Sequence, residues 1–130
     1  MRIERFETWW VERNRCLFDK KRQGNAAMPW DVVVLKLTTD TGLEGIATAL
    51  AARSGSITES YLHETIAPVV LGRDIHDREK IWHEFWTIDR HLTFFPVYLP
   101  GPVDVALWDL AAKEAKLPLY KYLGAYRTQL

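Results

Sequence analysis

The sequence lacks features that several classes of protein require. Its 130 residues contain one cysteine, Cys16, so neither an internal disulfide nor a thiolate metal cage can form. No window approaches the ~20 apolar residues of a membrane span, and the charged N-terminus is unlike a signal peptide. The 17 Lys and Arg residues balance 17 Asp and Glu residues, which argues against a dedicated binder of nucleic acid or anionic membranes. We therefore expect a soluble, cytoplasmic protein with no nucleic-acid or membrane partner.

Recognisable catalytic motifs are also missing. Neither a glycine-rich phosphate loop nor a nucleophile elbow occurs. His76, His83 and His91 are seven and eight residues apart, whereas zinc sites use tighter ligand spacing. Asp104 and Asp109 would point about 140° apart on a helix, so we expect a buried hydrogen bond and a surface ion pair rather than an acid–base pair. No catalytic residue and no metal ligand is predicted.

The residues that are present indicate one globular domain over residues 1–130. Hydrophobic residues make up 48% and charged residues 26% of the chain, as in ordinary soluble domains. Val33, Leu35 and Leu37 alternate with other residues and predict a strand, and Gly42 marks a turn into a further strand. We expect strands over about 2–14, 32–39 and 43–50.

A helical period replaces this alternation from Ser56 onward. Ser56 and Glu59 have the spacing of a capping box, and Pro68 is expected to limit the helix that they begin. Asp109 and Lys113 form an i,i+4 pair on a helix that is apolar on nearly all sides. We expect helices over about 57–67, 77–92, 102–116 and 118–123. The fold class is α+β, a three-stranded antiparallel sheet followed by a small helical bundle, with most of the six tryptophans in the core.

A long loop is predicted between the first two strands. Neither strand nor helix period survives there, and its basic part, residues 13–22, surrounds Phe18. Long loops in compact domains are usually functional or mobile. Taken alone, these residues leave two non-enzymatic alternatives open, namely a module that binds an anionic partner through residues 13–22 and a self-assembly module that uses the aromatic surface.

Several stretches together resemble one family. They are Thr39–Gly45 after a valine-rich strand, Val69–Asp74, and above all Asp104–Lys113 continuing to Leu117–Gly124. The chain is similar to the N-terminal capping domain of the enolase superfamily, in its mandelate racemase and muconate-lactonizing branch. The resemblance implies the α+β fold expected above, followed by a (β/α) barrel that is absent from this chain.

The resemblance also implies a chemistry. Family members abstract a proton next to a substrate carboxylate, with an essential Mg²⁺ held by carboxylates of the barrel. An acid-sugar dehydratase is favoured, with a racemase or a cycloisomerase as alternatives. This chain would hold no catalytic residue, metal ligand or cofactor, and would be inactive without its barrel. Its expected partners are the C-terminal barrel domain, a small-molecule carboxylate and further copies in a homo-oligomer.

By the same resemblance, two loops of the capping domain select the substrate. They correspond here to Arg15–Trp30 and Ala51–Gly55. The residues expected to line the substrate are Phe18, Lys20, Lys21, Arg22, Met28, Trp30, Arg53 and Ser54. The basic side chains suit a polyhydroxy carboxylate, whereas the methionine and the tryptophan would exclude water.

Overall fold

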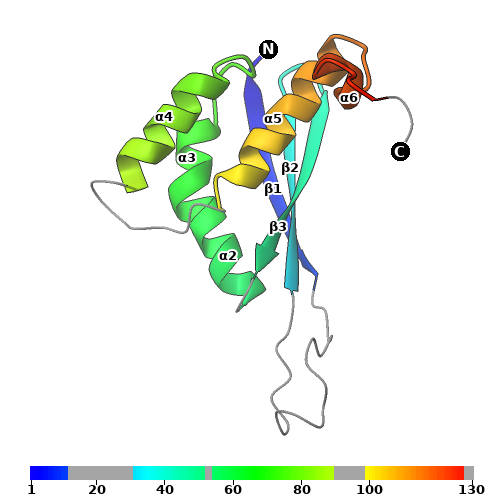
Figure 1. Cartoon of the computed structure of the whole chain (residues 1–130). Helices are drawn as coiled ribbons and strands as arrows, with labels where there is room; N and C mark the ends of the chain where they lie inside the picture. Colours follow the sequence, from blue (N-terminus) through cyan, green and yellow to red (C-terminus); the bar gives the residue numbers. More distant parts are fainter. Residues whose placement is uncertain (12–30, 52–53, 90–98, 128–130) are drawn as a thin grey trace, which may run out of the picture.

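The computed structural model describes residues 1–11, 31–51, 54–89 and 99–127. Its sheet contains the strands β1 (Ile3–Val11), β2 (Asp31–Thr39) and β3 (Glu44–Ala51). They are antiparallel and lie in the order β1-β2-β3, with helices packed on one face (Figure 1). The predicted α+β class and the three strands are confirmed, and residues 12–14 of the first predicted strand lie outside the described residues.

Alternation along β2 sets the two faces of the sheet. Val33, Leu35 and Leu37 are fully buried beneath the helices, as the period of two predicts. The turn after β2 also follows the prediction, because the Gly42 N–H donates to the Thr39 carbonyl over 2.9 Å and Gly42 has a φ of 82°. Glycine adopts such positive φ values without steric cost.

The first predicted helix extends further than expected. α2 (Gly55–Tyr61), the π-helical segment η1 (Leu62–Ile66) and α3 (Ala67–Val70) follow one another directly. The expectation that Pro68 limits this helix was wrong. The π-helical segment ends immediately before α3, so Pro68 falls in the first turn of a new α-helical segment, where a missing N–H is tolerated.

The predicted capping box was also wrong. Ser54 rather than Ser56 stands at the N-cap of α2, and among the described residues its side chain makes no capping hydrogen bond. The Ser56 hydroxyl lies 2.7 Å from that of Ser54. The Glu59 carboxylate instead accepts a hydrogen bond of 2.9 Å from the Thr8 hydroxyl. A contact with β1 has therefore replaced the local cap.

Three further helices lie within or close to the predicted ranges. They are α4 (Arg78–Ile88), α5 (Gly101–Glu114) and α6 (Leu119–Tyr122). α5 crosses β2 and β3, and its Val103, Leu107 and Leu110 complete the core with the inner face of the sheet. The other side of α5 is only partly covered, since Val105 is exposed by 49%. None of the described helices is long and apolar enough to cross a membrane.

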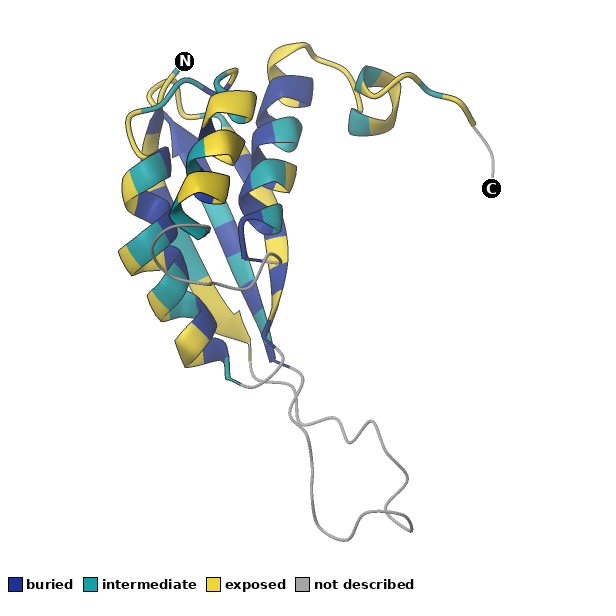
Figure 2. Cartoon of the chain, turned by 60° about the vertical axis from the view of Figure 1, so that its left-hand side comes forward, coloured by how far each residue is buried: buried dark blue, intermediate teal, exposed yellow. Residues whose placement is uncertain are grey.

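The expectation that most tryptophans lie in the core was wrong. Trp9, Trp10, Trp82 and Trp86 are exposed by 46%, 43%, 41% and 50%. Trp9 points to the uncovered face of the sheet, where the Lys36 ammonium lies 5.3 Å from its ring centroid. Among the described residues, helices cover only one face of the sheet (Figure 2), which leaves Trp9 accessible on the other face. Trp82 and Trp86 are instead exposed on α4.

Candidate functional site

One end of the sheet brings together the ends of both predicted specificity loops (Figure 1). β1 ends there at Val11 and β2 begins there at Asp31, so the first loop starts and finishes at this end of the sheet. Asp31 pairs with Ala51 at the end of β3, and α2 begins nearby at Gly55. Segments far apart in sequence thus leave from neighbouring points.

Of the eight residues expected to line the substrate, Ser54 alone falls among the described ones. Its backbone is extended, and its carbonyl accepts hydrogen bonds of 3.4 Å from the N–H and the hydroxyl of Thr58. Ser54 therefore stabilises the first turn of α2 through its backbone carbonyl. The remaining predicted residues lie outside the described residues: Phe18, Lys20, Lys21, Arg22, Met28, Trp30 and Arg53.

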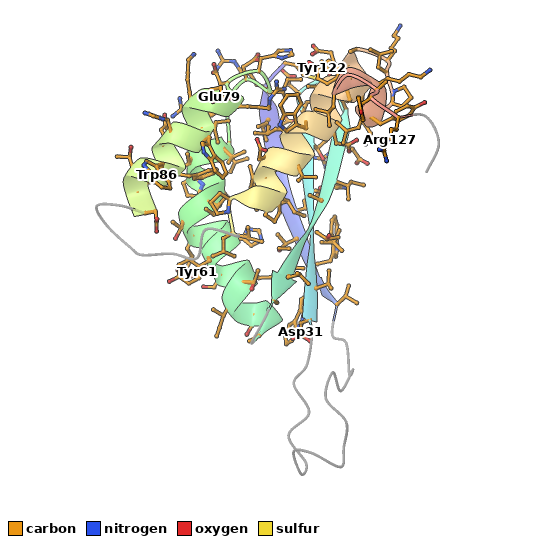
Figure 3. All side chains as sticks on the ribbon, viewed as in Figure 1. Asp31, Tyr61, Glu79, Trp86, Tyr122 and Arg127 are labelled. Atoms are coloured by element: carbon orange, nitrogen blue, oxygen red, sulfur yellow. The ribbon has the colours of Figure 1, made fainter. Side chains whose placement is uncertain are left out.

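Asp31 is a residue of this site that the sequence analysis missed. It is 3% exposed, and its Oδ2 accepts a hydrogen bond of 3.2 Å from the Gly55 N–H (Figure 3). Buried carboxylates require such partners because desolvation of a charge is costly. In the sequence, Asp31 is a single acidic residue directly before the apolar residues of β2. The local pattern does not indicate its contact with Gly55.

Trp10 approaches the same glycine from β1. A Cβ atom added at Gly55 would lie 2.0 Å from Cδ1 and 2.1 Å from Nε1 of the Trp10 indole. The backbone at the start of α2 therefore lies directly against the ring. Only glycine fits this position without movement of the indole, because real Cβ contacts are never this short.

A second set of polar contacts, made by Thr8 with Glu59 and His63, joins β1 to α2 and η1. The Thr8 hydroxyl donates to Glu59 over 2.9 Å and lies 2.8 Å from Nε2 of His63. A hydroxyl has one hydrogen, so His63 is the donor in its contact with Thr8. The His63 ring also meets Phe6 edge-on, with 5.6 Å between centroids. These contacts attach the helix to the strand.

No metal centre is formed by the described part of the chain. Within residues 1–11, 31–51, 54–89 and 99–127, no three His, Cys, Asp or Glu side chains are close enough to hold a metal ion. The surface ion pair predicted for Asp109 is confirmed, since the Lys113 ammonium lies 2.7 Å from its Oδ2, whereas Asp104 is only partly buried. Burial raises the pKa of the Asp104 carboxyl.

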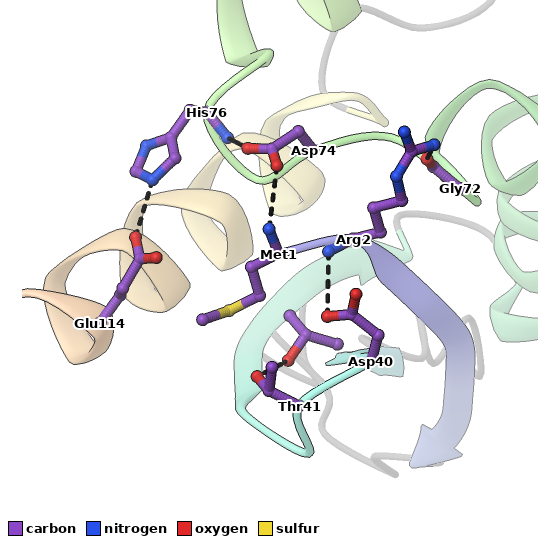
Figure 4. A network of polar contacts seen from close by, with 9 residues as sticks. Met1, Arg2, Asp40, Thr41, Gly72, Asp74, His76 and Glu114 are labelled. Carbon is purple, nitrogen blue, oxygen red and sulfur yellow. Dashed lines mark hydrogen bonds and ion pairs between the residues drawn. The ribbon is translucent and has the colours of Figure 1, made fainter.

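A polar network stabilises the opposite end of the sheet (Figure 4). The Asp74 carboxylate accepts from the His76 N–H and from the Met1 ammonium, each over 3.0 Å. Both interactions hold the pKa of Asp74 below its ordinary value. His76 Nε2 also lies 2.7 Å from a Glu114 carboxylate oxygen. This end therefore contains structural contacts, and the loops leave from the other end.

Comparison with known proteins identifies the family. The N-terminal domain of mandelate racemase and muconate lactonizing enzyme matches residues 25–124. The chain belongs to this family of enolase-superfamily N-terminal domains. The resemblance drawn from the sequence motifs, which implied a capping domain of this kind, is confirmed.

Similar curated proteins include a member of the D-galactonate dehydratase family and a D-mannonate dehydratase. The chain is 42% identical over 95 residues to the D-galactonate dehydratase family member RspA of Cellvibrio japonicus. It is 40% identical over 94 residues to a D-mannonate dehydratase of Rhizorhabdus wittichii. Each match covers 71% of this chain and 23% of the relative. The chain therefore spans about a quarter of the length of these relatives.

Solved structures share the fold. L-talarate dehydratase from Polaromonas sp. JS666, complexed with Mg and L-glucarate, has a TM-score of 0.75 and 28% identity, covering 97% of this chain and 36% of that protein. A racemase from Streptomyces coelicolor A3(2) with bound magnesium has a TM-score of 0.80 and 25% identity, covering 95% and 36% respectively. The chain thus corresponds to about a third of the length of these two proteins.

Proposed function

We propose that this capping domain belongs to an acid-sugar dehydratase, in which it selects the substrate while a C-terminal barrel performs the reaction. The observation that carries the proposal is the identity of about 40% to D-galactonate and D-mannonate dehydratases. The meeting of both loop ends at one edge of the sheet supports the selecting role. The binding-module alternative depends on residues 13–22, which lie outside the described residues.

The reaction proposed for the whole enzyme is proton abstraction next to the substrate carboxylate, followed by loss of water. Magnesium, which two similar structures contain, would stabilise the negative charge that develops on that carboxylate. The described residues of this chain do not gather the donors that the ion needs. We therefore assign Mg²⁺ and the catalytic base to the barrel, and no step of the reaction to the capping domain.

This division of labour predicts that the chain alone is inactive. Purified residues 1–130 supplied with Mg²⁺ should dehydrate neither D-mannonate nor D-galactonate. The same assay with the full-length parent enzyme is the positive control. Turnover by the isolated chain, at a rate that follows its concentration through a final purification step, would contradict the proposal.

We also propose that the basic loop residues bind the substrate carboxylate. In the full-length enzyme, Lys20→Met and Lys21→Met should each raise KM by about tenfold, because each removes an attraction to a carboxylate. Lys80→Met in α4 is the matched control, since this lysine is 72% exposed outside both loops, and it should leave KM unchanged. Equal KM values for all three variants would show that these lysines do not select the substrate. Met28 and Trp30 are assigned the exclusion of water.

Two uncovered apolar surfaces support the proposed partners. α6 contacts α5, where the Tyr122 and Trp108 rings meet edge-on with 5.9 Å between centroids, and it lies away from the sheet (Figure 2). Tyr120 and Leu123 of α6 are exposed by 49% and 59%. We assign this surface to the C-terminal barrel, since the matched region is only 23% of the relative's length. A cytoplasmic location, as for a metabolic enzyme, stays a prediction.

The outer face of the sheet supports a homo-oligomer. Trp9, Val11, Ile46 and Leu50 are exposed by 46%, 46%, 49% and 57%, which amounts to roughly 400 Å² of apolar surface. A stable interface buries about 800 Å² per partner, of which about 56–65% is apolar. This face therefore supplies most of the apolar area that a dimer of this chain needs.

Sedimentation equilibrium tests this interface. The chain should form a dimer, and Leu50→Lys should convert it to a monomer because a charge would be buried between the sheets. Ile57→Lys is the control, since Ile57 is exposed to a similar extent, 56%, on α2. A monomeric chain, or dimers that are equally stable in both variants, would overturn the assignment.

A further inference from the structure

The ends of the two predicted specificity loops are in contact with one another through three residues. We propose that Trp10, Asp31 and Gly55 are positioning residues that hold the ends of both loops together, so that the two loops act on the substrate together. The inference rests on the proposed function, because it assumes that these loops contact the substrate. It goes further by assigning residues that do not themselves line the substrate.

The first contact is the hydrogen bond of Asp31. This residue directly follows the first loop, and its buried carboxylate accepts a hydrogen bond from the N–H of Gly55, the last residue of the second loop. Hydrogen bonds with a charged partner contribute about 1.5–3 kcal/mol, and removal of one hydrogen-bond donor from a buried charge is costly. Separation of the two loop ends is therefore opposed.

The second contact is the indole of Trp10 against Gly55. Trp10 lies one residue before the end of β1 and thus at the other side of the first loop. The distances of 2.0 and 2.1 Å to an added Cβ leave no room for any side chain at Gly55. Residues from both sides of the first loop consequently meet the same glycine.

Strand pairing completes the connection. Asp31 pairs with Ala51, the last residue of β3, so its backbone contacts one side of the second loop while its carboxylate contacts the other. The four loop ends are then linked through Asp31 and Gly55. Displacement of any one end requires either a break in the sheet ladder or a buried carboxylate without its Gly55 partner.

A purely local role of Asp31 makes a different prediction. Asp31 could act only as a distant cap for α2, whose N-cap residue Ser54 makes no side-chain capping bond among the described residues. Loss of the carboxylate would then loosen α2 alone. The positioning role requires that a change on the α2 side also loosens the β1 side, across the indole contact.

Amide hydrogen exchange of the chain separates the two roles. Gly55→Ala should raise exchange at Trp10 and Val11 by at least about tenfold, because the indole must move. Gly101→Ala is the control, since a Cβ there meets nothing within 4 Å in the described part of the chain. Adding Trp10→Ala to Gly55→Ala should restore protection of the α2 amides by making room for the new methyl group.

Asp31 variants give the same test without a steric clash. Asp31→Ala should raise exchange both in the first turn of α2 and at the end of β1, whereas Asp31→Asn retains an oxygen acceptor and should resemble the parent chain. If faster exchange is confined to α2 in both Asp31→Ala and Gly55→Ala, the inference is wrong, whatever the enzyme does.

Kinetics of the full-length enzyme then tests the functional consequence. Asp31→Ala should raise KM for the acid sugar by about tenfold with a much smaller change in kcat, and Asp31→Asn should restore KM. Its effect should not add to that of Lys20→Met, since both act on the same loop arrangement. Coupled exchange with an unchanged KM would refute the role of these loops in substrate selection, while leaving their physical connection intact.

Discussion

Asp109 shows at the scale of a single residue how a helix is attached to a strand. Its Oδ2 accepts hydrogen bonds from the Ile46 N–H over 3.1 Å and from the Lys113 ammonium over 2.7 Å. Lys113 also donates to the Glu44 carbonyl over 2.7 Å. The i,i+4 pair expected from the sequence is present, and in addition it satisfies backbone groups of an edge strand.

Replacement of Asp109 should therefore cost more than loss of an exposed ion pair. Asp109→Ala is expected to lower the free energy of unfolding by about 1–3 kcal/mol, since it leaves the Ile46 N–H and the Lys113 ammonium without this acceptor. Lys80→Ala removes an exposed pair with Asp77 and should cost less than about 1 kcal/mol. Urea unfolding measures both, and equal losses would contradict this role of Asp109.

Asp74 predicts how stability depends on pH. Its pKa is lowered in the folded chain, first by the His76 N–H and then by the Met1 ammonium, so the folded state favours the carboxylate. The resulting stabilisation is present above the ordinary carboxyl pKa of about 4 and is lost as the pH falls through the lower folded value. Chemical denaturation between pH 6 and pH 3 should show this loss, and Asp74→Asn should reduce it.

At the scale of elements, the crossing of β3 and α5 depends on small residues. Ala47, Ala49 and Ala51 face the helices, and Gly45 lies at the closest approach to α5. A Cβ at Gly45 would be 2.4 Å from the Ala106 carbonyl oxygen. The helix can lie this near to the strand only because no side chain separates them.

Gly45→Ala is accordingly expected to destabilise the chain by about 1–3 kcal/mol, because helix and strand must move apart. Gly101→Ala is a control in the same helix, where the described surroundings leave open space for a methyl group. Thermal unfolding compares the two. Similar midpoints for both variants would show that α5 adjusts freely to the added volume.

At the scale of the whole molecule, the described residues form a well-packed core and leave apolar surfaces uncovered. The core lies between the sheet and the helices. The outer face of the sheet and the α6 region are exposed, whereas large uncovered apolar patches usually mark interaction sites. The length of the relatives, about four times the matched region, is consistent with a domain that folds against further protein.

The α6 surface can be tested separately from folding. Leu123→Glu should leave the unfolding of the isolated chain unchanged within about 0.5 kcal/mol, because this side chain is already 59% exposed. In the full-length enzyme the same change should lower the thermal stability, since a charge would enter the contact with the barrel. An unaffected full-length enzyme would place the barrel elsewhere.

The sequence alone determined the elements and the family, because alternation, helical period and turn residues act over a few neighbouring positions. The strand at Val33, Leu35 and Leu37, the turn at Gly42 and the resemblance to a capping domain were all predicted correctly. Tertiary structure decided which side chains meet across long separations. The partner of Glu59 is 51 residues away and that of Asp31 is 24 away, and local spacing carries no information about either distance.

The tertiary structure also decided which side chains are buried. A tryptophan on a strand is predicted to lie in the core, but its burial depends on which face of the sheet the helices cover. Here the helices cover the face opposite Trp9. A proline in a helix interior removes a backbone hydrogen bond and usually ends the helix. Pro68 instead lies in the first turn of α3, directly after the π-helical segment η1. Elements follow from local chemistry, whereas their contacts follow from how the whole chain packs.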